Sequence, residues 1–156
     1  MKLWKIFWIH IINNMNNNLS KHSDLGILII RLGIGLSFIF THGLSKITGG
    51  PERWVKLGGA MSNFGIDFLP GFWGFMAAFS EFVVPFFLIA GFLFRPAAFL
   101  MAFTMLTAMT SHLMKLDPWS KVIYPMELMF VFIALILTGP GKYSIWYLMQ
   151  KRKSEK

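Results

Sequence analysis

The segment FIFTHGLSKITGG, residues 38–50, ends a long apolar run and carries His42 and Lys46 one helical turn apart. Residues four apart in an α-helix share a face. The apolar run, residues 25–47, is long enough to cross a hydrocarbon core, which takes about 20 residues. Because an imidazole and an ammonium are costly against acyl chains, we expect this helix to turn a polar stripe, which extends back to Arg31, toward neighbouring helices.

The composition favours a membrane protein over an ordinary soluble domain. Hydrophobic residues make up 55% of the 156 residues and aromatic residues 17%, and the mean hydropathy is +0.57. Soluble domains are less apolar and more highly charged. The chain has no cysteine, which excludes a disulfide, a thiolate zinc site and a CxxC redox pair within it.

Three further apolar stretches are long enough to approach a full span, at residues 72–94, 97–114 and 122–138. Glycine and proline separate them. The turn FRPAA, residues 94–98, is so short that the second and third helices should form an antiparallel hairpin, with Arg95 reaching the headgroups. The sequence therefore predicts an all-α integral membrane four-helix bundle, with a surface loop at residues 48–71 covering one end.

The two ends of the chain differ from this bundle. The N-terminal LWKIFWIHII is interrupted by Lys5 and followed by an Asn tract, so we expect residues 1–22 to be an uncleaved interfacial segment and not a signal peptide. Met15 stays open as an alternative start. Residues 23–146 form the predicted transmembrane domain and residues 147–156 a basic tail. The net charge of +8 is densest in that tail, KRKSEK, which indicates lipid headgroups and no nucleic acid as its partner.

The basic residues also predict the orientation. Nine lie in the two tails and the Arg95 turn, against five on the opposite side: Lys46, Arg53, Lys56, Lys115 and Lys121. Because Lys and Arg gather on the cytoplasmic side of a membrane, both termini should face the cytoplasm.

Depth along the helices predicts which buried ionisable groups meet. Counted at about 1.5 Å per residue, Arg31 lies close enough to Glu81 to pair with it in the lower half of the bundle. The first, third and fourth helices place further groups near the outer surface at one depth, so we expect a second cluster there, an outer pocket with Lys46 at its rim. Its members are His42, His112, Tyr124 and Glu127.

Each cluster has more than one interpretation. The Arg31–Glu81 pair is best explained as a bundle-holding ion pair, because a charge without a partner is hard to insert into a membrane. The outer pocket is equally well explained as a small-molecule site or as histidines satisfied at an interface. Its two histidines and its carboxylate could also bind a metal, but residues spread over three helices give little support for that, and we predict no metal site.

The residues resemble a known family at several points in order. The runs RLGIGLSFIFTHGLSKITGGP, AAFSEFVVPFFLIAGFLFRPAA, SHL and ILTGPGKYSI are similar to the DoxX family of small four-helix bacterial membrane proteins, over residues 23–146. Trp146 departs from the pattern, since members often carry an Asp there. The resemblance implies a bacterial plasma (inner) membrane protein. It also implies, as in some members, a subunit of a respiratory or detoxifying oxidoreductase.

We therefore expect a membrane subunit or accessory of a redox system, whether quinone-linked or concerned with oxidative stress. It would bind a quinone or similar amphiphile and take electrons from a partner protein, because no intrinsic cofactor motif is visible. His42 and Glu127 are the candidate catalytic residues, as proton donors and acceptors, and the candidate ligand-binding residues are Arg31, His42, Lys46, Glu81, His112, Tyr124 and Glu127. A non-catalytic scaffold is the main alternative, small-solute transport is a weaker one, and a homo-oligomer stays open.

Overall fold

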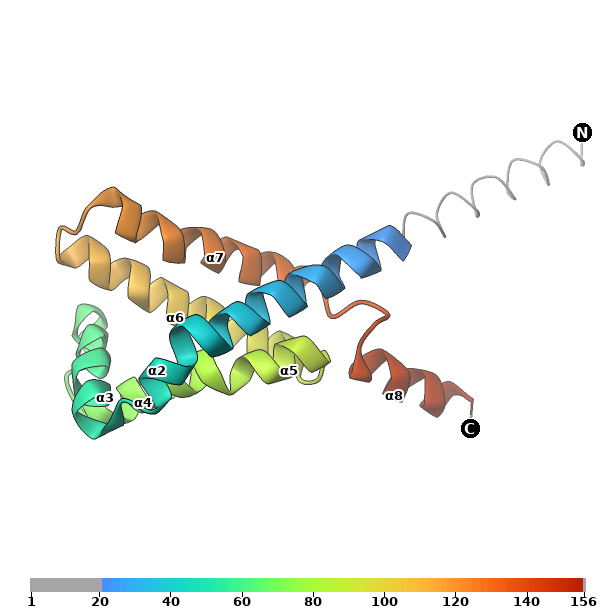
Figure 1. Cartoon of the computed structure of the whole chain (residues 1–156), viewed down its shortest axis with the longest axis horizontal. Coiled ribbons are helices and arrows are strands. Elements are labelled where there is room, and N and C mark those ends of the chain that lie inside the picture. The colour runs from blue at the N-terminus through green and yellow to red at the C-terminus, as the bar shows by residue number, and fades with distance from the viewer. Residues whose placement is uncertain (1–20, 156) are drawn as a thin grey trace, which may run out of the picture.

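The computed structural model describes residues 21–155 of the chain. Residues 1–20 of the predicted N-terminal interfacial segment lie outside them, and its last two residues, Lys21 and His22, begin the first spanning helix. Four helices are long and apolar enough to cross a membrane: Lys21–Ile47, Pro70–Ala90, Phe94–Met114 and Trp119–Thr138. No strand occurs among the described residues. The predicted all-α four-helix membrane bundle is confirmed, and Figure 1 shows the helices crossing along the long axis of the molecule.

The first spanning helix is not regular throughout. It is α-helical up to Ser37, forms a π-helical turn, η1, over Phe38–Gly43 and resumes as α2, Leu44–Ile47. Within this turn the backbone N–H of Leu44 donates to the carbonyl of Ile39, five residues earlier. A π-turn holds one residue more than an α-turn and often marks a functional site.

The second span consists of two helices, α4 (Pro70–Phe82) and α5 (Val84–Ala90). Pro85 lies in the first turn of α5. Proline has no N–H, so the helical bond that would reach the carbonyl of Glu81, four residues earlier, is lost. The break at Val83 therefore follows directly from the proline.

The turn between the second and third spans differs from the prediction. The chain turns at residues 91–93, where Gly91 and Leu93 both have positive φ, and α6 (Phe94–Met114) already contains Arg95 and Pro96. The predicted turn at residues 94–98 was therefore wrong by several residues. The reason is physical, since proline is tolerated in the first turn of a helix and glycine ends one in the left-handed conformation.

Helix α6 packs antiparallel to α7 (Trp119–Thr138), as Figure 1 shows. The small side chains of Ala98 and Ala102 are buried within the bundle. Larger buried side chains fill the core around them, among them Phe38, Leu88, Met101 and Phe132. In the same interior, Thr104 of α6 donates a hydrogen bond of 2.8 Å to the hydroxyl of Ser80 on α4.

The predicted surface loop at residues 48–71 is largely helical. It forms α3 (Gly50–Gly58) and the 3-10 helix η2 (Gly59–Phe64), and α3 lies at one end of the bundle in Figure 1. The contact between α3 and α4 depends on glycine, because a Cβ on Gly74 would lie 1.6 Å from the carbonyl oxygen of Trp54. This close approach holds α3 across the end of the bundle.

The opposite end carries the C-terminal helix α8 (Ile145–Ser154), at the same end of the bundle as the start of the first spanning helix (Figure 1). The hydroxyl of Ser144 accepts the backbone N–H of Tyr147 and caps this helix. Three basic residues, Lys151, Arg152 and Lys153, occupy its last turn. Cations at the C-terminal end of a helix interact favourably with its dipole.

Candidate functional site

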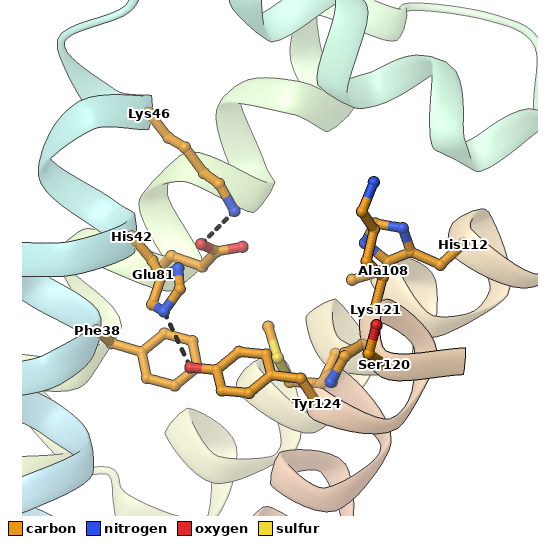
Figure 2. Close-up of a pocket in the computed structure, with 11 residues that line it drawn as sticks. Phe38, His42, Lys46, Glu81, Ala108, His112, Ser120, Lys121 and Tyr124 are labelled. Carbon is orange, nitrogen blue, oxygen red and sulfur yellow. Dashed lines mark hydrogen bonds and ion pairs between the residues drawn. The ribbon is translucent and has the colours of Figure 1, made fainter. Parts of the chain in front are cut away.

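A pocket of about 370 Å³ opens between the spanning helices near the α3 end. We call it the inner pocket, and Figure 2 shows its polar side chains. The first spanning helix contributes Phe38, His42 and Lys46, and α4 contributes Glu81. The remaining lining residues come from α6 and α7: Met105, Ala108, His112, Ser120, Lys121, Tyr124 and Pro125.

His42 and Tyr124 join the first spanning helix to α7 across this pocket. The Nε2 atom of His42 lies 3.0 Å from the hydroxyl of Tyr124, and Figure 2 draws this hydrogen bond. The rings of Phe38 and His42 pack with centroids 5.4 Å apart. A phenol can both donate and accept, so the Tyr124 hydroxyl retains hydrogen-bonding capacity for a ligand.

Lys46 and Glu81 form an ion pair at the edge of the same pocket (Figure 2). The side chain of Glu81 is only 4% exposed, whereas that of Lys46 is 24% exposed. Gly43 permits this arrangement, because a Cβ there would lie 2.3 Å from the carbonyl oxygen of Glu81. The π-turn and the glycine thus bring the backbone of the first helix directly against α4.

On the other side of the pocket, the Nδ1 atom of His112 lies 2.8 Å from a carboxylate oxygen of Asp117. Asp117 also lies 3.6 Å from the ammonium of Lys121. The hydrogen bond from His112 is the main cause that lowers the pKa of Asp117 below its usual range. The sequence interpretation missed Asp117, because the α6–α7 turn that brings it back to His112 depends on Leu116 adopting a positive φ of 52°.

Arg31 does not pair with Glu81, so that prediction was wrong. Its guanidinium donates instead to four backbone carbonyls, of Leu88, Ile89, Pro140 and Tyr143. The carbonyls in the last turn of a helix have no partner within it, and α5 ends directly after Ile89, at Ala90. A cation at this terminus satisfies those oxygens, and Arg31 is only 1% exposed. We call this arrangement the Arg31 site.

Glu127 does not line the inner pocket either. It is exposed on α7, one turn beyond Tyr124. Its predicted place in the outer pocket is therefore wrong. The other predicted members of that pocket, His42, Lys46, His112 and Tyr124, do lie together, and with Glu81 they line what we call here the inner pocket. Among residues 21–155, no three His, Asp or Glu side chains lie close enough together to hold a metal ion.

The arrangement can bind a polar head group inside an apolar wall. It offers a phenol and an imidazole that share a hydrogen bond, and beside them a buried carboxylate with its ammonium partner. Such groups can exchange protons with a ligand or hold a developing negative charge.

Comparison with known proteins agrees with the sequence resemblance. The family model described as DoxX matches residues 26–113. The protein described as inner membrane protein YqjF of Escherichia coli (strain K12) is 32% identical over 139 residues, which cover 86% of this chain and 99% of that relative. No solved structure matches the chain.

Proposed function

The chain belongs to the DoxX family of membrane proteins, and on that premise we propose that it is a membrane component of a redox system that binds a quinone or a similar small amphiphile in the inner pocket. The observation that supports this most directly is the hydrogen bond between His42 and Tyr124 at the wall of a pocket between spanning helices. Ligand sites are typically apolar cavities with a few convergent polar groups.

The residues of this chain have distinct roles in the proposal. The Tyr124 hydroxyl and the His42 imidazole orient a carbonyl of the head group, and His42 exchanges a proton with it. Lys46 lies beside Glu81 at the pocket wall and stabilises negative charge on the bound head group. The bound quinone accepts the electrons, which a partner protein supplies. Arg31 and Glu127 have no part in this site.

Binding of a short-chain menaquinone or ubiquinone analogue to the purified protein tests the proposal. We expect His42→Ala and Tyr124→Phe each to weaken binding by about three- to tenfold, the usual effect of losing one hydrogen bond. Glu127→Gln is the matched control, because it neutralises a charged side chain of the same helix outside the pocket. Equal affinity in all three variants and the wild type would remove the pocket from the proposal.

A scaffold without ligand chemistry is the second candidate. The ion pair between Lys46 and Glu81 favours it, since both charges already have a partner within the chain. In that case the double variant Lys46→Met/Glu81→Met should retain cellular function. The ligand proposal expects the same double variant to lose it while folding normally.

We also propose that both ends of the chain face the cytoplasm. The beginning of the first spanning helix and helix α8 lie at the same end of the bundle (Figure 1), and the basic turn of α8 belongs on the cytoplasmic side. Fluorescence from a green fluorescent protein fused after Lys156 supports this orientation. Activity from alkaline phosphatase fused at the same place contradicts it.

A further inference from the structure

A second and larger cavity, of about 1300 Å³, lies between α3 and η2 on one side and α4 and α6 on the other. We call it the outer cavity. It adjoins the inner pocket, because Lys46, Glu81, Ala108 and His112 line both. The other residues that line the outer cavity do not line the inner pocket, so they can be replaced without changing the lining of the inner pocket.

The rim of the outer cavity carries an excess of positive charge. Arg53 and Lys56 come from α3, and Lys115 follows the end of α6. All three are exposed, and none forms an ion pair within the part of the chain that the structure describes. Glu52 is the one carboxylate that opposes them in the lining, since Glu81 is already paired with Lys46.

Much of the remaining wall of the outer cavity is apolar. Phe72, Trp73 and Met76 contribute from α4, and Leu100 and Phe103 from α6. These residues belong to two helices that cross the membrane, whereas Arg53 and Lys56 belong to α3, across the end of the bundle, and Lys115 follows the end of α6. The cavity is therefore amphipathic, with cations on α3 and at the end of α6 and apolar side chains along the two spanning helices.

We propose that the outer cavity binds an anionic phospholipid, with its phosphate on Arg53, Lys56 and Lys115 and an acyl chain against the apolar wall. Phosphate oxygens form strong charge-assisted hydrogen bonds with Arg and Lys. An acyl chain gains free energy by leaving water for the aromatic and methionine side chains. Free phosphate shares the head-group chemistry but leaves the apolar wall uncovered. The site does not depend on the function proposed for the inner pocket.

Retention of phosphatidylglycerol by the purified protein tests this inference. The full chain is prepared in a neutral detergent, incubated with equal amounts of phosphatidylglycerol and phosphatidylcholine, and the bound lipid is measured by native mass spectrometry. We expect the wild type to prefer phosphatidylglycerol. Each basic residue near an anionic head group contributes about fivefold in affinity, so the triple variant Arg53→Gln/Lys56→Gln/Lys115→Gln should weaken this binding by about tenfold or more.

Two further variants separate the cavity from general surface charge. Lys151→Gln/Arg152→Gln/Lys153→Gln removes the same number of cations from α8, at the other end of the bundle, where they meet only headgroups at the membrane surface, and should reduce retention much less than the rim variant does. Ala77→Phe adds a ring to the cavity lining and keeps every charge, so it should reduce retention. The three rim cations form no ion pair within residues 21–155, so their replacement should not alter the unfolding temperature.

The inference is overturned if the rim variant retains phosphatidylglycerol as the wild type does. It is also overturned if the α8 variant loses as much phosphatidylglycerol as the rim variant. If the Ala77→Phe variant retains as much phosphatidylglycerol as the wild type, the lipid does not bind in the outer cavity. Displacement of the lipid by millimolar inorganic phosphate overturns the lipid assignment in favour of a free anion. Quinone binding is measured on the same variants, and its failure in the wild type would leave the lipid result standing.

Discussion

The Arg31 site and the inner pocket differ in the partners of their charges. At the Arg31 site, one guanidinium donates to four backbone carbonyls and is only 1% exposed. At the inner pocket, side chains pair with side chains around a cavity of about 370 Å³. A cation saturated by backbone oxygens has one spare donor at most and ties chain segments together. Groups that border a cavity keep the capacity to bind something else.

Replacement of Arg31 by Met should have the largest effect. It removes a donor from four carbonyl oxygens, of which that of Leu88 keeps the N–H of Gly91. Each of the other three buried unpaired groups costs about 1–3 kcal/mol, so we expect the free energy of unfolding to fall by about 3 kcal/mol or more. Thermal unfolding in detergent measures this. Arg152→Met, on the exposed face of α8, is the control. Equal unfolding temperatures for the two variants would contradict a structural role for Arg31.

Gly43→Ala tests the inner pocket through its backbone. The added Cβ would lie 2.3 Å from the carbonyl oxygen of Glu81, so the first helix must move away from α4. Such overpacking costs about 1–3 kcal/mol. We expect weaker quinone-analogue binding as well, because the shift separates Lys46 from Glu81.

Gly33→Ala is the matched control for Gly43→Ala. It lies in the same spanning helix, and a Cβ there meets nothing within 4 Å. Because Ala is the better helix former, the control should be neutral or stabilising. A Gly43→Ala protein as stable as this control would mean that the two helices are not held as closely as the structure indicates.

Breaking the ion pair between Lys46 and Glu81 should lower the free energy of unfolding by a smaller amount. Lys46→Met leaves the carboxylate of Glu81 buried and alone, yet the Lys46 side chain is 24% exposed, so we expect about 1–2 kcal/mol, below the cost of breaking a fully buried pair. The double variant Lys46→Met/Glu81→Met should recover most of this loss. A double variant less stable than the single one would show that Glu81 has another role in holding the bundle.

Acidification should give the smallest effect. The pKa of Asp117 is lowered chiefly by its hydrogen bond with His112. A carboxylate with a lowered pKa stabilises the fold fully above the ordinary value of about 3.9 and loses this contribution as the pH falls through the lower folded value. Asp117→Asn should therefore make the unfolding temperature of the protein depend less on pH between pH 5 and about pH 3. An unchanged acid profile would contradict this account.

The spans and the inward stripe of the first helix could be predicted from the sequence, because a helix crossing the membrane takes about 20 apolar residues and residues four apart share a face. The partners of Arg31 could not be predicted from the sequence. Helix depth indicates which side chains lie level with one another, but Arg31 uses backbone oxygens at two chain turns. Those of Leu88 and Ile89 lie where α5 ends before Gly91, and those of Pro140 and Tyr143 lie in the segment after α7.

Glu127 shows a second limit of the same reasoning. It lies close to Tyr124 in depth, but three residues along an α-helix also rotate the side chain by about 60° around the axis. Tyr124 is already 45% exposed at the pocket edge, so that rotation places Glu127 outside. The pairing of His112 with Asp117 required the left-handed backbone at Leu116, which no pattern in the sequence indicates.

The π-turn over Phe38–Gly43 sets the rotational phase of everything after it in the first helix. A regular α-helix with the same number of residues would turn Lys46 about 100° around the axis relative to Arg31, because the π-turn holds one residue more than an α-turn. The lower half of the helix would keep its contacts while the upper half lost its alignment with α4. The extra residue of this turn therefore aligns the half of the helix that carries Arg31 with the half that forms the pocket.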